Sequence, residues 1–251
     1  MFDAVDGPFM DSSEPQYDTS TSSAPRLSMA AENYLLSIYR LDEQDTRVTL
    51  TILAEHLKTL PVDEGLGTSL PSVGGMIRRM VREGLVETTA NKDVVLTSQG
   101  RSSAESIVRR HRLAERLVVD LLGLDLHMAH VEAHRLEHAI SPILEEKIVK
   151  ALGNPTTCPF GHPIPGSGYS SDQPSKSLDS SEVGEQVVIH SIPEDDQALL
   201  KYLVDNSLMP GQAVTVKDAA ETRGVITLLC NGRDVVFSYD VAAKIRVRPL
   251  E

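Results

Sequence analysis

Apolar residues recur at helical spacing in three runs near the start of the sequence. In each run the apolar side chains fall on one stripe, as in an amphipathic helix. The runs are Ala30–Leu41, Thr49–Leu60 and Pro71–Gly84. Two short β-prone runs follow, Leu85–Thr89 and Val94–Thr97, with a polar turn between them. A helix–turn–helix followed by a β-hairpin predicts a winged helix, which is a frequent DNA-binding module.

Two longer helical patterns occupy the middle of the chain. The first, from Arg101 to about Leu122, has an apolar face broader than a small domain needs, so part of it is expected to form a dimer surface, with simple core packing as the alternative. The second runs from Asp125 to about Leu152. Pro142 interrupts it, which predicts one helix ending near residues 139–141 and another beginning at Pro142.

The last third of the sequence differs from the rest in composition and in its apolar pattern. Residues 153–181 are dense in Pro, Gly and Ser, which predicts an extended linker. Beyond residue 185, five short β runs and one amphipathic helix near Asp195–Asp205 predict a small closed β-barrel. The expected fold is therefore mainly α with small β parts. The expected domains are an acidic disordered tail (1–26), a winged helix (27–100), a helical domain (101–153), a linker (154–181) and a barrel domain (182–251).

Charge and composition limit the class of protein. The net charge is −12, but residues 58–112 carry nine bases against six acids, so one locally basic segment lies in an acidic chain. On charge alone, contact with a polyanion and a mixed solvated face are equally good explanations. No apolar run reaches 18 residues and no secretory leader is visible, which predicts no membrane span. The two cysteines form no disulfide framework, and we expect a cytoplasmic protein.

The most informative chemistry lies in the stretch H-V-E-A-H-R-L-E-H, residues His130–His138. On a helix, His130, His134, Glu137 and His138 stand at i, i+4, i+7 and i+8, so they share one stripe. Three imidazoles and a carboxylate on one face are suited to hold a divalent cation. On the preceding helix, His111 and Glu115 stand at i and i+4 and form a second candidate pair.

Two other functions have to be weighed. His134 to His138 also spells H-x-x-E-H, the inverted zinc-protease signature, in which both histidines bind Zn²⁺ and the glutamate acts as base. A hydrolase needs an open coordination position, and the additional ligands His111, Glu115 and His130 argue against one. The third interpretation is a winged-helix adaptor that binds other proteins. We expect no enzyme, because no other catalytic arrangement stands out.

Three motifs together resemble a known family. They are R-R-H-R-L-A-E-R (Arg109–Arg116), the histidine-rich stretch, and C-P-F-G-H-P-I-P-G (Cys158–Gly166). From about Ala30 to Leu250 the chain resembles the metal-dependent transcriptional repressors of the diphtheria toxin repressor and manganese transport regulator family. The resemblance implies a winged helix, a helical metal-binding and dimerisation domain and an SH3-like (FeoA-like) barrel. It also implies a homodimer that binds double-stranded operator DNA and represses metal-homeostasis genes in response to Mn²⁺ or Fe²⁺.

The resemblance also implies two metal sites per subunit. One would use His111, Glu115 and His130, with Glu194 and Gln197 from the barrel. The other would use Asn33, His134, Glu137 and His138. Asn33 stands where the family typically has Met or Asp, and His134 where it has Cys or Glu. This second set lacks sulfur, which suits Mn²⁺ or Fe²⁺ without excluding Zn²⁺, Co²⁺ or Ni²⁺.

The expected DNA reader is the helix that begins near Pro71. Gly75 stands where the family normally carries a polar side chain, and Gly74 precedes it. We therefore expect Ser69, Pro71 and Ser72 to read bases, and Arg78, Arg79 and Lys92 to contact phosphates.

Overall fold

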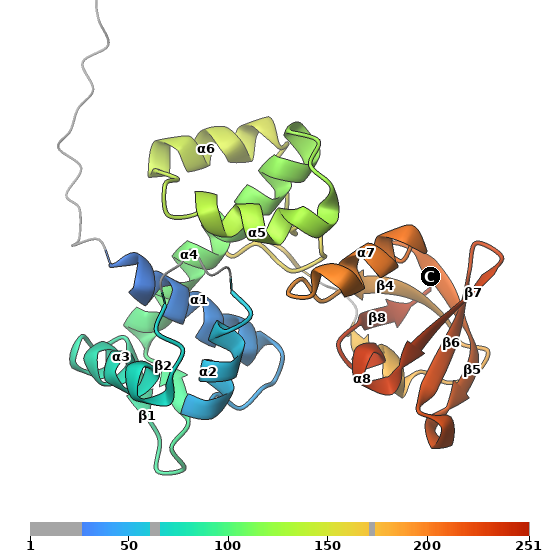
Figure 1. Ribbon diagram of the computed structural model, residues 1–251. Helices are drawn as coiled ribbons and strands as arrows, with labels where there is room; N and C mark the ends of the chain where they lie inside the picture. The colour runs from blue at the N-terminus through green and yellow to red at the C-terminus, as the bar shows by residue number, and fades with distance from the viewer. Residues whose placement is uncertain (1–26, 61–65, 171–173, 251) are drawn as a thin grey trace, which may run out of the picture.

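The computed structural model describes residues 27–60, 66–170 and 174–250. Figure 1 shows a winged-helix unit at lower left, a helical unit at the top and a β-sheet unit at right, with α4 rising from the first unit to the second. The tail predicted over residues 1–26 lies outside the described residues. The helices are α1 Met29–Glu43, α2 Leu50–Leu57, α3 Leu70–Arg82, α4 Ser98–Arg116, η2 Leu117–Leu121, α5 Leu126–Leu136, α6 Pro142–Ala151, η3 Leu178–Ser180, α7 Gln197–Asp205, η4 Glu221–Arg223 and α8 Tyr239–Ala242.

The winged-helix unit forms as its pattern predicts. The first three helices begin at hydroxyl caps, because Ser28, Thr49 and Ser69 each accept a hydrogen bond from a backbone N–H of the first turn. The hairpin strands β1 Val86–Thr88 and β2 Val94–Leu96 pair antiparallel. Their apolar faces close over one core with α1 and the first half of α4. This core fixes α1 against α4, and both helices contribute to the site described below.

The helical unit departs from the prediction in two places. The helix that begins at Ser98 widens into a π-helical segment at Leu117–Leu121. α5 ends at Leu136, earlier than expected, and a tighter turn follows in which the amide of Ala139 donates to the carbonyl of Leu136. Ser141 then caps α6, with Pro142 in its first turn. Glu137 and His138 therefore lie just beyond α5, not on it.

The C-terminal unit is one antiparallel sheet of six strands in the order β3-β8-β4-β5-β6-β7. The strands are β3 Lys176–Ser177, β4 Gln186–Ser191, β5 Ala213–Ala220, β6 Val225–Cys230, β7 Arg233–Ser238 and β8 Arg246–Pro249. The five predicted runs are all present, and β3 is additional. Val118 and Ala129 of the helical unit share the sheet's apolar core, so the two units pack directly together. The predicted fold class, helical with a C-terminal β-barrel domain, is confirmed.

Residues 156–166 differ from the extended linker that we predicted. Cys158, Phe160 and Ile164 are completely buried between the helical and barrel units. The turns of this segment expose backbone carbonyls, and arginines of α4 satisfy them: Arg109 donates to the carbonyl of Pro165 at 2.8 Å and Arg116 to that of Thr157 at 2.8 Å. Pro and Gly content alone could not reveal these partners.

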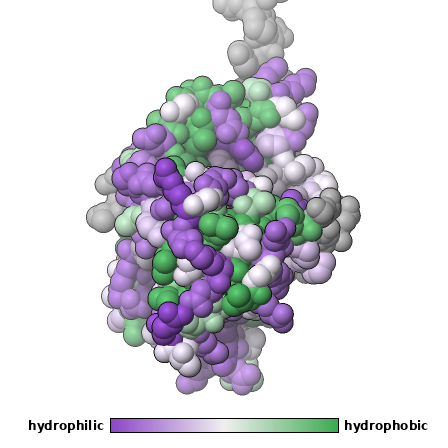
Figure 2. Space-filling model, turned by 90° about the vertical axis from the view of Figure 1, so that its right-hand side faces the viewer, coloured by the Kyte–Doolittle hydropathy of each residue, from purple (hydrophilic) through white to green (hydrophobic). Residues whose placement is uncertain are grey.

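Apolar side chains also remain exposed on the helical unit. Figure 2 shows them as a green group at the upper end of the molecule. Large exposed apolar residues of this unit are Leu121, Leu122, Leu124, Ile143 and Leu144. No helix in the described ranges is both long and apolar enough to cross a membrane.

Candidate metal centre

Four buried side chains from three elements converge on one point, and we call them the first cluster. His111 and Glu115 come from α4, His130 from α5 and Glu194 from the loop before α7, and one ligand atom of each lies within 4.8 Å of all the others. His111 Nε2 is 2.9 Å from Glu115 Oε1 and 3.0 Å from His130 Nδ1. None of the four is more than 6% exposed. The i, i+4 spacing on α4 thus places two donors opposite a third on α5.

The first cluster has unsatisfied oxygen atoms that fit a cation. Glu115 Oε2 and Glu194 Oε2 are buried and accept no hydrogen bond from the described part of the chain. A buried carboxylate oxygen without a donor is costly, and two such oxygens beside imidazole nitrogens match the ligands of a divalent metal. The donor set therefore fits the predicted metal.

The protonation of the first cluster also favours a cation. Burial lowers the pKa of His111, and lowers that of His130 well below its usual value. Both rings are therefore neutral at pH 7 and can offer a lone pair. Burial raises the pKa of Glu115 to about 7 and raises that of Glu194. Burial thus favours the protonated form of both carboxyls, whereas a divalent cation would favour the ionised form.

A second cluster lies where α1 meets the end of α5, and comprises Asn33, His134, Glu137 and His138. His138 Nε2 is 3.0 Å from Asn33 Oδ1 and 3.3 Å from Glu137 Oε1. His134 Nδ1 is 3.4 Å from the same Glu137 oxygen. An amide oxygen and a carboxylate oxygen aimed at one ring nitrogen are satisfied by a protonated ring or by a cation between them. Asn33, His134 and Glu137 are completely buried.

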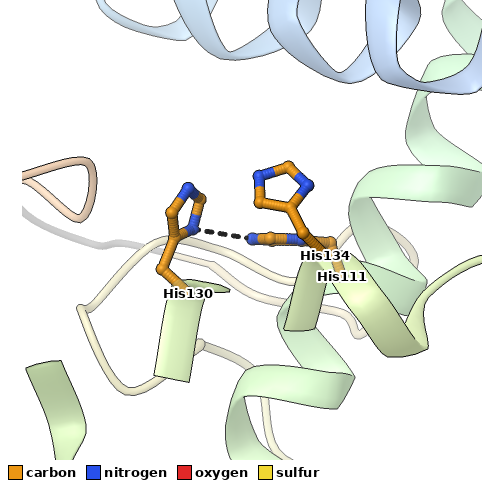
Figure 3. A group of neighbouring side chains, drawn as sticks. All are labelled: His111, His130 and His134. Carbon is orange, nitrogen blue, oxygen red and sulfur yellow. Dashed lines mark hydrogen bonds between the residues drawn. The ribbon is translucent and has the colours of Figure 1, made fainter. Parts of the chain in front are cut away.

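His111 joins the two clusters. Its Nε2 contacts Glu115 and His130, while its Nδ1 pairs with the carboxylate of Glu137. Figure 3 shows the rings of His111, His130 and His134 converging, with the His134 ring on the side that faces α1. Their centroids are 4.6–4.8 Å apart. The two predicted sites are therefore adjacent parts of one buried centre.

Gln197 does not join the first cluster. It is the first residue of α7, its side chain is exposed, and its amide nitrogen lies 4.0 Å from the sulfur of Met128. The P-E-D-D-Q segment instead brings Asp195 near the cluster, with Oδ1 3.4 Å from His130 Nε2. The turn into α7 explains the difference, because it directs residues 194 and 195 inward before the helix begins.

Glu32 belongs to the second cluster although the sequence analysis did not single it out. Its Oε2 is 2.6 Å from His138 Nδ1, and its Oε1 accepts from Arg110 at 2.7 Å. Burial opposes ionisation, but the hydrogen bonds from His138 and Arg110 outweigh it and lower the pKa of Glu32. Only its position beside Asn33 could have indicated it, since its contact with His138 spans 106 residues.

The residues predicted to contact DNA lie on the surface of the winged-helix unit. Ser69, Pro71 and Ser72 are exposed at the start of α3. Arg78 and Arg79 are exposed further along the helix, and Lys92 is exposed at the hairpin tip with a φ of 65°. Ser69 also caps α3 through its side chain. The sequence analysis missed Arg47, which steadies the hairpin by donating to the Asn91 carbonyl at 3.1 Å and by pairing with Asp93.

The fold and the buried centre agree with comparisons to known proteins. Models of the iron-dependent repressor N-terminal DNA-binding domain match residues 26–94, and those of the metal-binding and dimerisation domain match 97–166. A FeoA domain model matches residues 176–249. The chain thus belongs to the iron-dependent repressor family, whose members are DNA-binding transcriptional regulators and not enzymes.

Individual relatives cover nearly the whole chain. The iron-dependent repressor IdeR of Mycobacterium leprae is 34% identical over 229 residues, which are 86% of this chain and 95% of that protein. The diphtheria toxin repressor of Corynebacterium glutamicum is 33% identical over 231 residues, or 88% and 96%. The structure of a manganese-dependent transcriptional repressor in complex with manganese superposes with a TM-score of 0.78 at 31% identity, covering 88% of this chain and all of that one. These relatives favour a repressor over the hydrolase that H-x-x-E-H suggested.

Proposed function

We propose that this chain is a cytoplasmic, metal-dependent transcriptional repressor that binds operator DNA as a homodimer when Mn²⁺ or Fe²⁺ fills its buried centre. One observation carries the proposal: Asn33 of the DNA-binding unit faces His138 of the helical unit across 105 residues, in a cluster of metal-type donors. Relatives named as iron-dependent and manganese-dependent repressors support it.

The second cluster explains how metal would control DNA binding. A bound divalent ion supplies a point of attachment that α1 and the helical unit share. Asn33 would hold the DNA-binding unit to that point, while Glu137 and His138 would hold the dimerisation unit. This fixes the spacing of the two α3 helices in the homodimer, so that both can enter successive major grooves. Metal and DNA then favour each other reciprocally, by ~1–3 kcal/mol.

The donor types favour Mn²⁺ or Fe²⁺. The first cluster offers two imidazoles and two carboxylates, and the second offers an amide oxygen, a carboxylate and two imidazoles. Nitrogen and oxygen donors without sulfur suit both ions, although raw affinity would rank Zn²⁺ above Mn²⁺. We propose these eight residues as ligands and omit Gln197, whose side chain lies elsewhere.

The decisive test removes a second-cluster ligand. His138→Ala should keep the dimer and reduce Mn²⁺-stimulated operator binding to its metal-free level in a gel-shift titration at fixed ionic strength, because α1 loses its attachment. His127→Ala, which alters a histidine in the first turn of α5 that belongs to neither cluster, is the matched control and should respond normally. An unchanged metal response in His138→Ala would refute the assignment of the second cluster.

A further inference from the structure

Arg40 is a buried cation at the junction of all three units. It lies on α1, seven residues after Asn33 and therefore on the same face of the helix, and it is only 3% exposed. Its Nη2 donates to Glu194 Oε1 at 2.7 Å and to Asp195 Oδ1 at 2.6 Å. Its Nη1 lies 3.3 Å from His130 Nε2. One guanidinium thus links the DNA-binding unit to the barrel and to the helical unit.

Two of its partners, Glu194 and His130, belong to the first cluster. Glu194 uses Oε1 for Arg40, and its Oε2 lies 3.6 Å from His162 Nε2 without a hydrogen-bond partner within the described ranges. His130 presents Nε2 to Arg40 and Asp195, while its Nδ1 faces His111 and Glu115. Arg40 and Asp195 therefore form an outer layer that sets the orientation of two candidate ligands. Such outer partners usually decide how well ligands are presented.

The charges at this junction need Arg40 when no metal is present. Glu194 is 3% exposed and Asp195 is largely enclosed, so ionising both without a counter-charge would be costly. Arg40 thus stabilises the acidic loop of the barrel against α1 in the metal-free protein.

We propose that Arg40 is a positioning residue for the first cluster, and that it keeps barrel residues 191–197 seated against α1 when no metal is bound. The proposal rests on the proposed metal-dependent function, because Glu194 and His130 are candidate ligands there. Without Arg40, the segment keeps the hydrogen bonds that join Ile192 to Phe160 and His162, but Glu194 and Asp195 lose their counter-charge. A cation held by Glu194 would replace that charge, so the seating of residues 194 and 195 would become metal-dependent.

Amide hydrogen exchange on the full chain tests this directly. In EDTA, Arg40→Met should exchange faster than wild type in peptides covering residues 191–197, and added Mn²⁺ should restore protection. Wild type should show no loss of protection on chelation, and Arg40→Lys should lie between the two because it keeps the charge but loses the forked geometry. Arg101→Met is the control, since it removes an exposed ion pair to Asp42 of the same helix α1 and should leave the segment unchanged.

The outcomes distinguish a failure of this proposal from a failure of the proposed metal-dependent function. Equal exchange of Arg40→Met and wild type in EDTA would overturn it, as would fast exchange that Mn²⁺ does not reverse in a variant with native circular dichroism. If Arg40→Met does not fold, Asp195→Asn removes a partner from the barrel side and should give the same metal-reversible change. By contrast, absence of Mn²⁺ binding to wild type in calorimetry would contradict the proposed function and leave the comparison in EDTA valid.

Discussion

Glu32 determines which nitrogen of His138 can face a cation. An Nδ1–H that donates to Glu32 leaves the Nε2 lone pair directed at Asn33 and Glu137. Carboxylates behind metal-binding histidines fix the tautomer in this way.

Glu32→Gln should therefore weaken Mn²⁺ binding at the second cluster by about 10–100-fold. Isothermal calorimetry would measure the change. Glu55→Gln, which alters an exposed carboxylate paired with Lys58 on α2, should bind normally. Equal affinities in the two variants would mean that Glu32 has only a structural role.

At this scale the sequence revealed donors but not their outer partners. The spacing of His130, His134, Glu137 and His138 was enough to predict a buried polar stripe, and six of the eight proposed ligands come from that stripe and the His111–Glu115 pair. Glu32 and Arg40 look like ordinary surface charges on a helix. Their roles depend on contacts with residues 106 and 155 positions away, which no local pattern encodes.

Among the elements, α3 carries two glycines whose surroundings differ from those of Gly100 in α4. A Cβ on Gly75 would meet only the Arg78 guanidinium, at 3.9 Å, whereas a Cβ on Gly100 would lie 1.7 Å from the Leu85 carbonyl oxygen. α3 therefore gains no packing from the missing side chain at position 75, while α4 needs glycine for its close approach to the hairpin.

Gly75→Ala should raise the free energy of unfolding by about 0.5–1 kcal/mol, because alanine restricts the unfolded chain and fits the helix without a clash. Urea denaturation checks this. Gly100→Ala is the opposite case and should be strongly destabilising or fail to fold. A destabilised Gly75→Ala variant would show that the position has no room for a methyl group.

Elements with a regular spacing of apolar residues were predictable from the sequence, and elements held in place by tertiary contacts were not. The helices of the winged-helix unit and the runs of the barrel follow from apolar spacing. The two-residue strand β3 and the buried turn around Phe160 do not, because they depend on pairing with β8 and on the arginines of α4. The early end of α5 at Leu136 is likewise outside what the period alone predicts.

For the molecule as a whole, buried histidines predict sensitivity to acid. Burial lowers the pKa of His56 to about 4 and that of His162 to about 3, against about 6.5 in an unfolded chain. The unfolded chain therefore binds protons that the folded chain does not, and stability is lost as the pH falls below 6.5. The raised pKa values of Glu115 and Glu194 act in the opposite direction, for Glu115 between about pH 4.5 and 7. The histidines with lowered pKa values, which also include His111 and His130, are more numerous than these two glutamates, so the loss of stability in acid dominates.

In EDTA the melting temperature should accordingly fall between pH 6.5 and pH 4.5, and His162→Asn should make the fall shallower. Each histidine contributes at most about 1.4 kcal/mol per pH unit. Differential scanning calorimetry at several pH values measures this dependence. A melting temperature that stays level over this range, or an equally steep fall in His162→Asn, would contradict the assigned protonation states.

The exposed apolar residues of the helical unit predict the dimer surface. Leu122 is 65% exposed and Leu121 49% exposed at the end of η2. Leu122→Asp should convert the dimer to monomer in light scattering, because a charge would be buried in the contact, and operator affinity should fall with it. Leu229→Asp, which alters an exposed leucine of the barrel, should remain dimeric. A Leu122→Asp variant that remains dimeric would show that the dimer interface lies elsewhere.

The shared ring of His111 has a consequence for how the protein reads metal. If a cation were held at Nε2, the ring proton would lie on Nδ1, where it would donate to Glu137. Because Glu137 belongs to the second cluster, filling the first cluster would favour one orientation of a proposed ligand of the second. The two proposed sites would then respond to metal as a coupled pair through one imidazole.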